Sequence, residues 1–169
     1  MNTKGCKNRQ VAFWWGLLLC FSFVWVGCGT PMIAGTKVPA TKNNVAIMSV
    51  LKDYKRAALK GRWDKVLNLV STRYHDTNGT PDPNDDTGFS QLKKDFYSDA
   101  FKKVRLLRFF FVIETIKYPR QGEAEIDLKI QYTYQFPRGK YQPGLDTGFK
   151  KHRIVMAKEN GRWMILKGI

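Results

Sequence analysis

Residues 123–136 alternate between apolar and polar side chains almost without interruption, and this pattern constrains the fold more than any other feature of the chain. Successive side chains of a β-strand point to opposite faces, so a period of two predicts a strand with one apolar face. A strand with one apolar face is typical of an antiparallel sheet that is covered on one side. The side chains expected on the apolar face are Ala124, Ile126, Leu128, Ile130, Tyr132, Tyr134 and Phe136.

The flanking segments predict the strands that pair with this one. Residues 104–118 are rich in phenylalanine and β-branched residues, and a turn at 119–122 joins them to the alternating stretch. Residues 149–158 and 162–169 flank Asn160-Gly161, a dipeptide that suits a tight hairpin turn because both residues tolerate positive φ. We therefore expect a meander of long antiparallel strands.

Helical periodicity precedes the strands. Apolar residues recur at helical spacing from Val45 to Leu59, and Gly61 is a suitable end for that helix. A second helix is expected near residues 63–70, and a third from Ser90, a candidate cap, to about residue 103, after a polar loop at 71–89. The predicted fold class is α+β, with the helices packed on one face of a curved antiparallel sheet.

The first 28 residues predict export from the cytoplasm. A basic start is followed by residues 11–26, which carry no charge and are mostly large and apolar. This organisation is typical of a secretory signal peptide. An uncleaved signal anchor is the alternative, because about 20 apolar residues suffice to cross a bilayer.

The end of this segment resembles the lipobox of bacterial lipoproteins. Gly27 precedes Cys28, the residue that would receive diacylglycerol and palmitate, although Trp25 stands where an aliphatic residue is usual. The resemblance implies a signal peptide at 1–27, a lipid-attached flexible tether at 28–43 and a folded domain at 44–169. All three cysteines occur at or before position 28, so the mature domain would contain no disulfide. Gly29, rather than aspartate, favours the outer membrane of the cell envelope.

Two segments of the domain resemble the nuclear transport factor 2-like and SnoaL-like families. These segments are Ala-Leu-Lys-Gly-Arg-Trp-Asp at 58–64 and Glu-Asn-Gly-Arg-Trp-Met-Ile at 159–165. The resemblance implies a cone-shaped, cystatin-like roll. In such families the cone can hold a small ligand, an active site or nothing, so the fold alone does not determine the activity.

The family includes isomerases and dehydratases that place an acid, histidine or tyrosine inside the cone. Glu114, Tyr132 and Tyr134 are the catalytic candidates, while His75 and His152 are expected to be exposed. Glu114 shares a strand face with apolar neighbours that would raise the pKa of its carboxyl; alternatively it faces solvent and pairs with Arg108 or a lysine. No nucleophilic triad is present, and no cofactor is expected.

The loop at 76–86 is a calcium candidate. Asp76, Asn78, Thr80 and Asp82 place oxygen ligands at alternate positions, as calcium loops do, but proline replaces the expected glycine at position 81. A solvated turn is the alternative interpretation, because the same residue types favour loops.

Charge and hydrophobicity predict partners. After removal of the signal peptide, 26 basic residues (29 less Lys4, Lys7 and Arg9) oppose 14 acids, which gives a net charge of +12. Such a surface favours an anionic lipid or glycan as a partner, and no nucleic-acid motif is present.

Residues 104–118 are apolar on both strand faces, so the second face of the sheet must also be covered. Members of the resembling family often pair through this sheet, which indicates a homodimer or an envelope protein partner.

These observations favour a non-enzymatic binding or accessory protein, attached to the cell envelope through Cys28 and facing the periplasm or the exterior. A small-molecule enzyme of isomerase or dehydratase type is the first alternative. A structural subunit of a membrane complex is the second.

Overall fold

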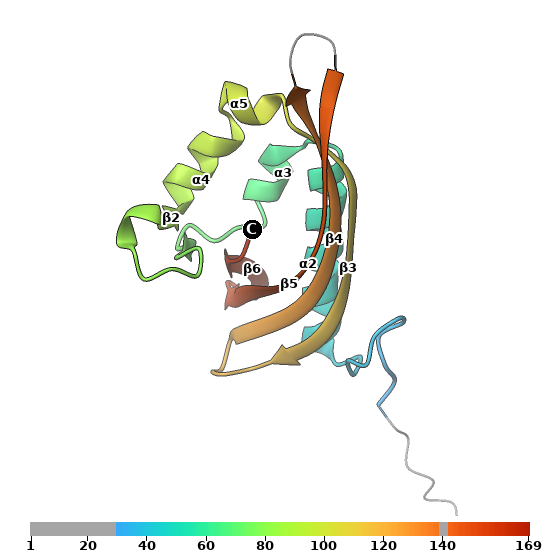
Figure 1. The fold of residues 1–169 in the computed structure, drawn as a ribbon. Helices are drawn as coiled ribbons and strands as arrows, with labels where there is room; N and C mark the ends of the chain where they lie inside the picture. The colour runs from blue at the N-terminus through green and yellow to red at the C-terminus, as the bar shows by residue number, and fades with distance from the viewer. Residues whose placement is uncertain (1–29, 139–141) are drawn as a thin grey trace, which may run out of the picture. The chain divides into compact units, whose positions relative to one another are not determined.

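The computed structural model describes residues 30–138 and 142–169, and residues Pro31–Ile169 form one compact unit (Figure 1). The predicted signal peptide and Cys28 lie outside the described residues. Four long strands form an antiparallel sheet in the order β3-β4-β5-β6, as the alternating pattern predicts. Their bounds are β3 Arg105–Lys117, β4 Glu123–Arg138, β5 Gln142–Glu159 and β6 Arg162–Lys167.

The alternation along β4 matches its burial. Ala124 and Ile126 are fully buried on the concave face, whereas Glu123, Glu125 and Lys129 point to the other side and stay partly exposed. Ile126 lies opposite Ile116 of β3 and Ile154 of β5, so the apolar face continues across the sheet. The sequence-based fold class, α+β with helices on a curved antiparallel sheet, is confirmed.

The edge strand β3 is irregular at two places. Its register with β4 shifts between Leu106 and Arg108 and again between Ile113 and Thr115. Each shift inserts an extra residue, which bends the strand and increases its local twist. The second shift contains Glu114.

Two glycines of β5 give room to aromatic side chains of β4. Gly148 lies opposite Tyr132, and Gly144 lies opposite Phe136. A Cβ atom at either glycine would collide with the ring that faces it. The glycines therefore allow the rings to lie directly over the neighbouring strand, a cross-strand arrangement that also permits the sheet to curve.

Helix α2 (Lys42–Leu59) lies on the concave face of the sheet (Figure 1). The Thr41 side chain accepts a hydrogen bond from the Asn44 N–H and so caps its first turn. Ile47 and Leu51 are fully buried, but Val45, expected on the same stripe, is half exposed. Gly61, at φ +62, follows the helix, and the short helix α3 (Trp63–Leu67) comes next.

The helix expected from Ser90 to residue 103 is two helices. Helix α4 (Phe89–Phe96) begins after Gly88, and Ser90 does not cap it. Ser98 interrupts the segment, because its side chain caps helix α5 (Asp99–Lys102) by accepting from the Phe101 N–H. Both helices contribute rings that pack on Trp63, with centroid distances of 5.0 Å to Phe96 and 4.8 Å to Phe101.

The loop predicted at 71–89 contains a small hairpin. Strands β1 (His75–Asp76) and β2 (Thr87–Gly88) pair with each other, and the 3-10 helix η2 (Pro83–Asp85) lies between them. The Glu159 carboxylate connects the start of this segment to the main sheet. It accepts hydrogen bonds from the buried Ser71 hydroxyl at 2.8 Å and from Arg73 Nη2 at 2.6 Å.

The segment before α2 packs on the domain, although its composition predicts a tether. Met32 and Pro39 pair across a turn, and Val38 is only 4% exposed within the core. The Asn44 side chain donates to the Pro39 carbonyl at 2.8 Å. A single buried valine among glycines, prolines and threonines gives no periodic signal, so the sequence pattern does not reveal this contact.

Candidate functional site in the cone

A cavity of about 220 Å³ lies between α2 and the concave face of the sheet. Its apolar wall comes from α2 and from the inner faces of β3, β4 and β5. Its charged and amide groups come from the end of β1, from the loop after it and from the inner face of β5. The polar and aromatic side chains that line it are Tyr54, Asp76, Asn78, Phe109, Phe111, Tyr134, Lys150 and His152.

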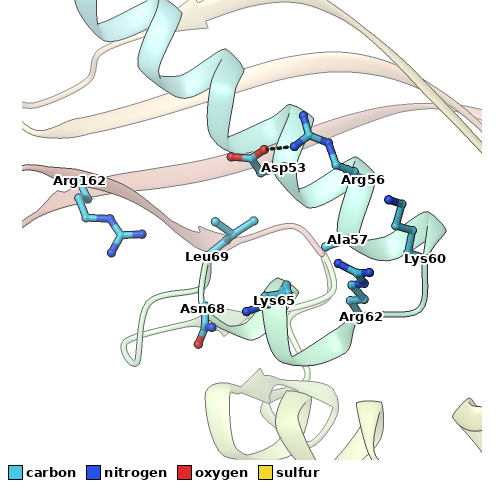
Figure 2. A pocket seen from close by; sticks show the side chains of 9 residues that line it. All are labelled: Asp53, Arg56, Ala57, Lys60, Arg62, Lys65, Asn68, Leu69 and Arg162. Atoms are coloured by element: carbon cyan, nitrogen blue, oxygen red, sulfur yellow. Dashed lines mark ion pairs between the residues drawn. The ribbon is translucent and has the colours of Figure 1, made fainter.

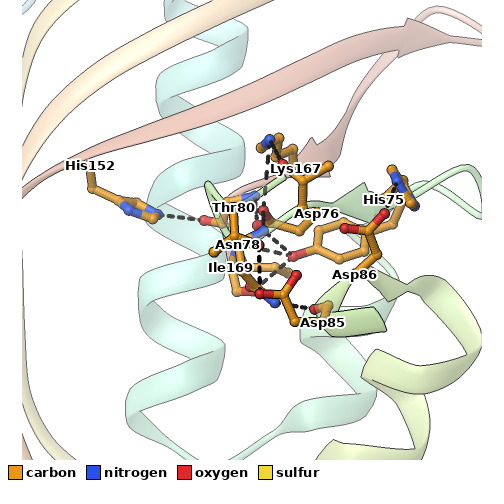
Figure 3. Close-up of polar contacts among 12 residues, drawn as sticks. His75, Asp76, Asn78, Thr80, Asp85, Asp86, His152, Lys167 and Ile169 are labelled. Carbon is orange, nitrogen blue, oxygen red and sulfur yellow. Dashed lines mark hydrogen bonds and ion pairs between the residues drawn. The ribbon is translucent and has the colours of Figure 1, made fainter. Parts of the chain in front are cut away.

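Hydrogen bonds tie the polar groups at one end of this cavity to each other (Figure 3). Asp76 Oδ2 accepts from the Gly168 N–H at 2.8 Å, and Asp76 Oδ1 accepts from the Asn78 N–H at 3.0 Å. The Tyr74 hydroxyl donates to the Ile169 carbonyl at 2.8 Å, and His152 Nε2 donates to the Gly168 carbonyl at 2.7 Å. The segment around Asp76, strand β5 and the residues after β6 therefore meet at one end of the cavity.

The phenols around the cavity hold their protons firmly. Burial raises the pKa of Tyr74 to about 12, against the opposing effect of its hydrogen bond to Ile169. Burial also raises the pKa of Tyr54 and that of Tyr134, in both cases with a smaller contribution from nearby ionisable groups. At neutral pH these hydroxyls therefore act as hydrogen-bond donors and not as bases.

The three catalytic candidates from the sequence do not lie together. Tyr134 lines the cavity. Tyr132 packs beside Tyr134, with ring centroids 5.1 Å apart and the ring planes tilted by 48°, and is partly buried. Glu114 occurs at the bulge of β3 on the side away from the cavity, where its carboxylate lies 2.5 Å from Lys129 Nζ. This is the lysine-paired alternative for Glu114, and the apolar environment proposed for its carboxyl is not present.

The calcium candidates make hydrogen bonds within the loop. The Asp76 oxygens accept backbone N–H groups, and Asp82 caps η2 by accepting from Asn84. Thr80 donates to Asp85 at 2.7 Å, and the Asn78 amide donates to the Asp85 carbonyl. No group of three or more His, Cys, Asp or Glu side chains in the described part of the chain is arranged to hold a metal ion.

The position of His152 along β5 explains why its side chain points into the cone, contrary to the sequence-based prediction. His152 is separated by even intervals from the buried Ile154 and Met156, so it shares their face and points into the cone. Its basic neighbours Lys151 and Arg153 suggest a solvent-exposed histidine, and that expectation was wrong for His152. His75 is exposed as expected, and its Nε2 lies 3.0 Å from Asp86.

The convex face of the sheet differs from the cone. Phe110 of β3, Gln131 of β4 and Phe149 of β5 form one row across it, and the two phenylalanines are 56% and 68% exposed. The Lys55 ammonium lies 4.6 Å from the centre of the Phe110 ring. Val112 and Leu145 are also more than half exposed. These four side chains, Phe110, Val112, Leu145 and Phe149, are called the convex apolar row below.

Ion pairs lie beside one end of the convex apolar row. Lys129 pairs with Glu114, and Arg153 contacts Asp127 at 2.7 Å and Glu125 at 3.4 Å. The hydrogen bond from Arg153 lowers the pKa of Asp127, with a further contribution from the Thr115 hydroxyl. These acids compensate Lys129 and Arg153, whereas Arg105, Arg108 and Lys151 on the same face form no ion pair with another described residue.

No helix within residues 30–138 and 142–169 meets the length and hydrophobicity that a membrane span requires. Lipid attachment at Cys28 falls outside these residues.

Comparison with known proteins identifies the fold. A ketosteroid isomerase-like protein from Erwinia carotovora atroseptica shares 13% identity over 76% of this chain and 94% of its own, with a TM-score of 0.59. An NTF-2 like protein of unknown function from Shewanella oneidensis shares 17% identity over 75% and 96%, with a TM-score of 0.51. A protein provisionally named scytalone dehydratase, from Novosphingobium aromaticivorans, shares 16% identity over 75% and 80%, with a TM-score of 0.57.

No protein-family model and no curated protein matches the sequence. At these identities the structural similarity shows the NTF2-like fold alone. The fold expected from the resemblance is therefore confirmed, and the function needs a separate argument.

Proposed function

We propose that this chain is a non-enzymatic binding or accessory protein of the cell envelope, anchored through Cys28 and acting as a homodimer. The observation that carries the proposal is the convex apolar row. An isolated subunit gains nothing from exposing two phenylalanines, a valine and a leucine on one sheet face, and such a patch is typical of an interaction surface.

Local charge favours a second copy as the occupant. The chain that begins at Cys28 would carry a net charge of +12, so two copies repel each other over most of their surfaces. On the convex face, Glu114, Glu125 and Asp127 compensate Lys129 and Arg153, while Arg105, Arg108 and Lys151 keep their charge. Two copies can therefore approach through this face with reduced repulsion, and the apolar rows would bury each other.

Analytical ultracentrifugation of the protein in detergent tests the dimer. We expect the wild type to sediment as a dimer and Phe149→Glu to sediment as a monomer, because the new carboxylate would have to be buried in the interface. Val45→Glu is the matched control, because Val45 is a similarly exposed apolar residue on α2. A monomeric wild type, or equal dissociation of both variants, would refute the dimer. Recovery of a different envelope protein on this face would support the structural-subunit alternative instead.

Mass spectrometry of the mature protein tests the anchor. We expect a chain that begins at Cys28 and carries the mass of diacylglycerol, and we expect Cys28→Ser to abolish this modification. Cys20→Ser is the control, because Cys20 lies in the segment that would be removed. An intact N-terminus with an unmodified Cys28 would contradict the lipoprotein assignment and favour the signal anchor.

The cavity in the cone favours the enzyme of isomerase or dehydratase type as the second candidate. Asp76 and His152 reach a space large enough for a small ligand, although both are used in hydrogen bonds to backbone groups. Turnover of a small carbonyl compound that is lost in Asp76→Asn, but retained in Glu114→Gln, would favour this candidate. If the wild type turns over no small carbonyl compound, this test gives no support to the enzyme candidate.

A further inference from the structure

A second hollow of about 310 Å³ lies outside the cone, where the end of α2, helix α3 and the start of β6 meet (Figure 2). Five cationic side chains line it. They come from three separate segments, and Figure 2 places Arg162 across the hollow from Arg56 and Arg62. The five are Arg56 and Lys60 of the α2 end, Arg62 and Lys65 of the α3 segment, and Arg162 of β6.

These charges are poorly compensated. Asp53 is the one acid that lines the hollow, and it pairs with Arg56 at 3.3 Å. Lys65 lies 4.0 Å from the neighbouring Asp64. Lys60, Arg62 and Arg162 form no ion pair with any carboxylate in the described ranges. At least three positive charges therefore face one small volume without a counter-ion from the described part of the chain.

Helix electrostatics explains only part of this arrangement. Basic residues near the last turn of a helix interact favourably with the negative end of its dipole, which accounts for Arg56 and Lys60. It does not account for Arg162, which follows the Asn160-Gly161 turn on a different element. Nor does it explain Arg62, the N-cap residue of α3, because a positive charge is disfavoured at that end of a helix.

We propose that this hollow is a binding site for a phosphate group, carried by a small molecule or by a lipid headgroup. Guanidinium groups bind phosphate oxygens through paired, charge-assisted hydrogen bonds, and three of the five cations are arginines. A cleft lined by charges of one sign concentrates oppositely charged ligands. The volume falls at the lower end of the range for small-molecule sites, which leaves room for a phosphate and part of its carrier.

The floor of the hollow fits such a carrier. Ala57 and Leu69 supply apolar surface between the cations, and the Asn68 side chain adds a hydrogen-bonding group. Neither the convex apolar row nor the cone cavity contributes a residue to this site, so the proposal does not depend on the dimer or on the anchor.

Isothermal titration calorimetry of the full-length protein in detergent tests the site. The probes are inorganic phosphate, inorganic pyrophosphate and dihexanoyl phosphatidic acid. We expect saturable binding, with pyrophosphate bound at least tenfold more tightly than phosphate because it carries more charge. We also expect the affinity to fall as salt is raised, because ions screen the exposed cations. Absence of saturable binding for all three probes would overturn the proposal.

Paired variants locate the binding. The double variant Arg62→Gln, Arg162→Gln should weaken pyrophosphate binding at least tenfold. The control is Lys94→Gln, Lys103→Gln, which removes the same charge from exposed positions of the α4–α5 segment and should bind as the wild type does. Equal weakening in both double variants would show general charge attraction and would refute a defined site.

A gain of affinity provides a test that misfolding cannot imitate. Asp53→Asn removes the one acid of the lining and frees Arg56 from its pair, so pyrophosphate should bind at least threefold more tightly. Unchanged or weaker binding in this variant would contradict the site.

The same titrations distinguish the two sources of phosphate. If dihexanoyl phosphatidic acid binds at least tenfold more tightly than both inorganic phosphate and pyrophosphate, the site recognises a lipid headgroup together with its glycerol. If either inorganic probe binds as tightly as the lipid, the site recognises the phosphate of a soluble compound. Both results support a phosphate site.

Discussion

The two faces of β4 belong to one strand, but their side chains differ in burial and in the groups that they contact. On the concave face Ile126 and Leu128 are at most 2% exposed, because α2 and the neighbouring strands cover them. On the convex face Glu125 and Lys129 remain partly exposed and pair with charged groups of the adjacent strands. The apolar side chains of the concave face form the core on which the fold depends. The convex apolar row is not part of that core, so it is informative about partners.

The largest expected effect comes from the concave face. Ile126→Ala should lower the free energy of unfolding by about 2–5 kcal/mol, because it removes buried methyl groups and leaves a cavity. Gln131→Ala, on the convex face of the same strand, should change it by less than about 0.5 kcal/mol. Urea unfolding at low protein concentration measures both. Similar losses for the two variants would show that the faces do not differ in their contribution to stability.

Substitution of Gly168, which follows β6, should have a smaller effect on the free energy of unfolding. Gly168 has a φ of +94, and a Cβ atom there would collide with the Arg153 carbonyl oxygen. Gly168→Ala should therefore destabilise by about 2–3 kcal/mol, from backbone strain and overpacking together. Gly79→Ala is the control, because Gly79 has a φ of +76 but open space around it, so only the strain of about 1 kcal/mol applies. Thermal unfolding compares the two, and an equal loss would exclude the collision.

The smallest expected effect is a pH dependence on the convex face. Because Arg153 lowers the pKa of Asp127 in the folded state, the pair stabilises the fold above about pH 4. This contribution is lost as the pH falls through the lower, folded pKa. The side chains are partly exposed, so we expect no more than about 0.5 kcal/mol. Acid unfolding should show a flatter decline of stability below pH 4 in Asp127→Asn than in the wild type. An identical decline in Asp127→Asn would contradict this role.

The regular part of the fold was predictable because its signal is local. The alternation at 123–136 and the Asn160-Gly161 turn identify β4, β5 and β6. Strands β4 and β6 form close to their predicted bounds, whereas β5 begins at Gln142 and not at the predicted position 149. The division between α4 and α5 was not predictable from the apolar period, because Leu92 and Phe96 continue a helical pattern up to the point where Ser98 caps a new helix.

The candidate site was harder to predict because distant segments form it. Asp76 and His152 are 76 positions apart in the sequence, and they converge only through Gly168. The alternation along β5 places His152 on the same face as buried strand residues, but its charged neighbours suggest that it is exposed. The hollow lined by Arg62 and Arg162 gave no sequence signal for the same reason.

The two bulges of β3 have a consequence for how this protein associates. A regular edge strand offers a continuous ladder of free N–H and C=O groups on which identical chains can add and grow into fibrils. Register shifts within β3 interrupt that ladder, and Arg105, Arg108 and Lys117 place charge along it. Growth from this edge along the hydrogen-bonding direction is therefore hindered, as the proposed face-to-face dimer requires.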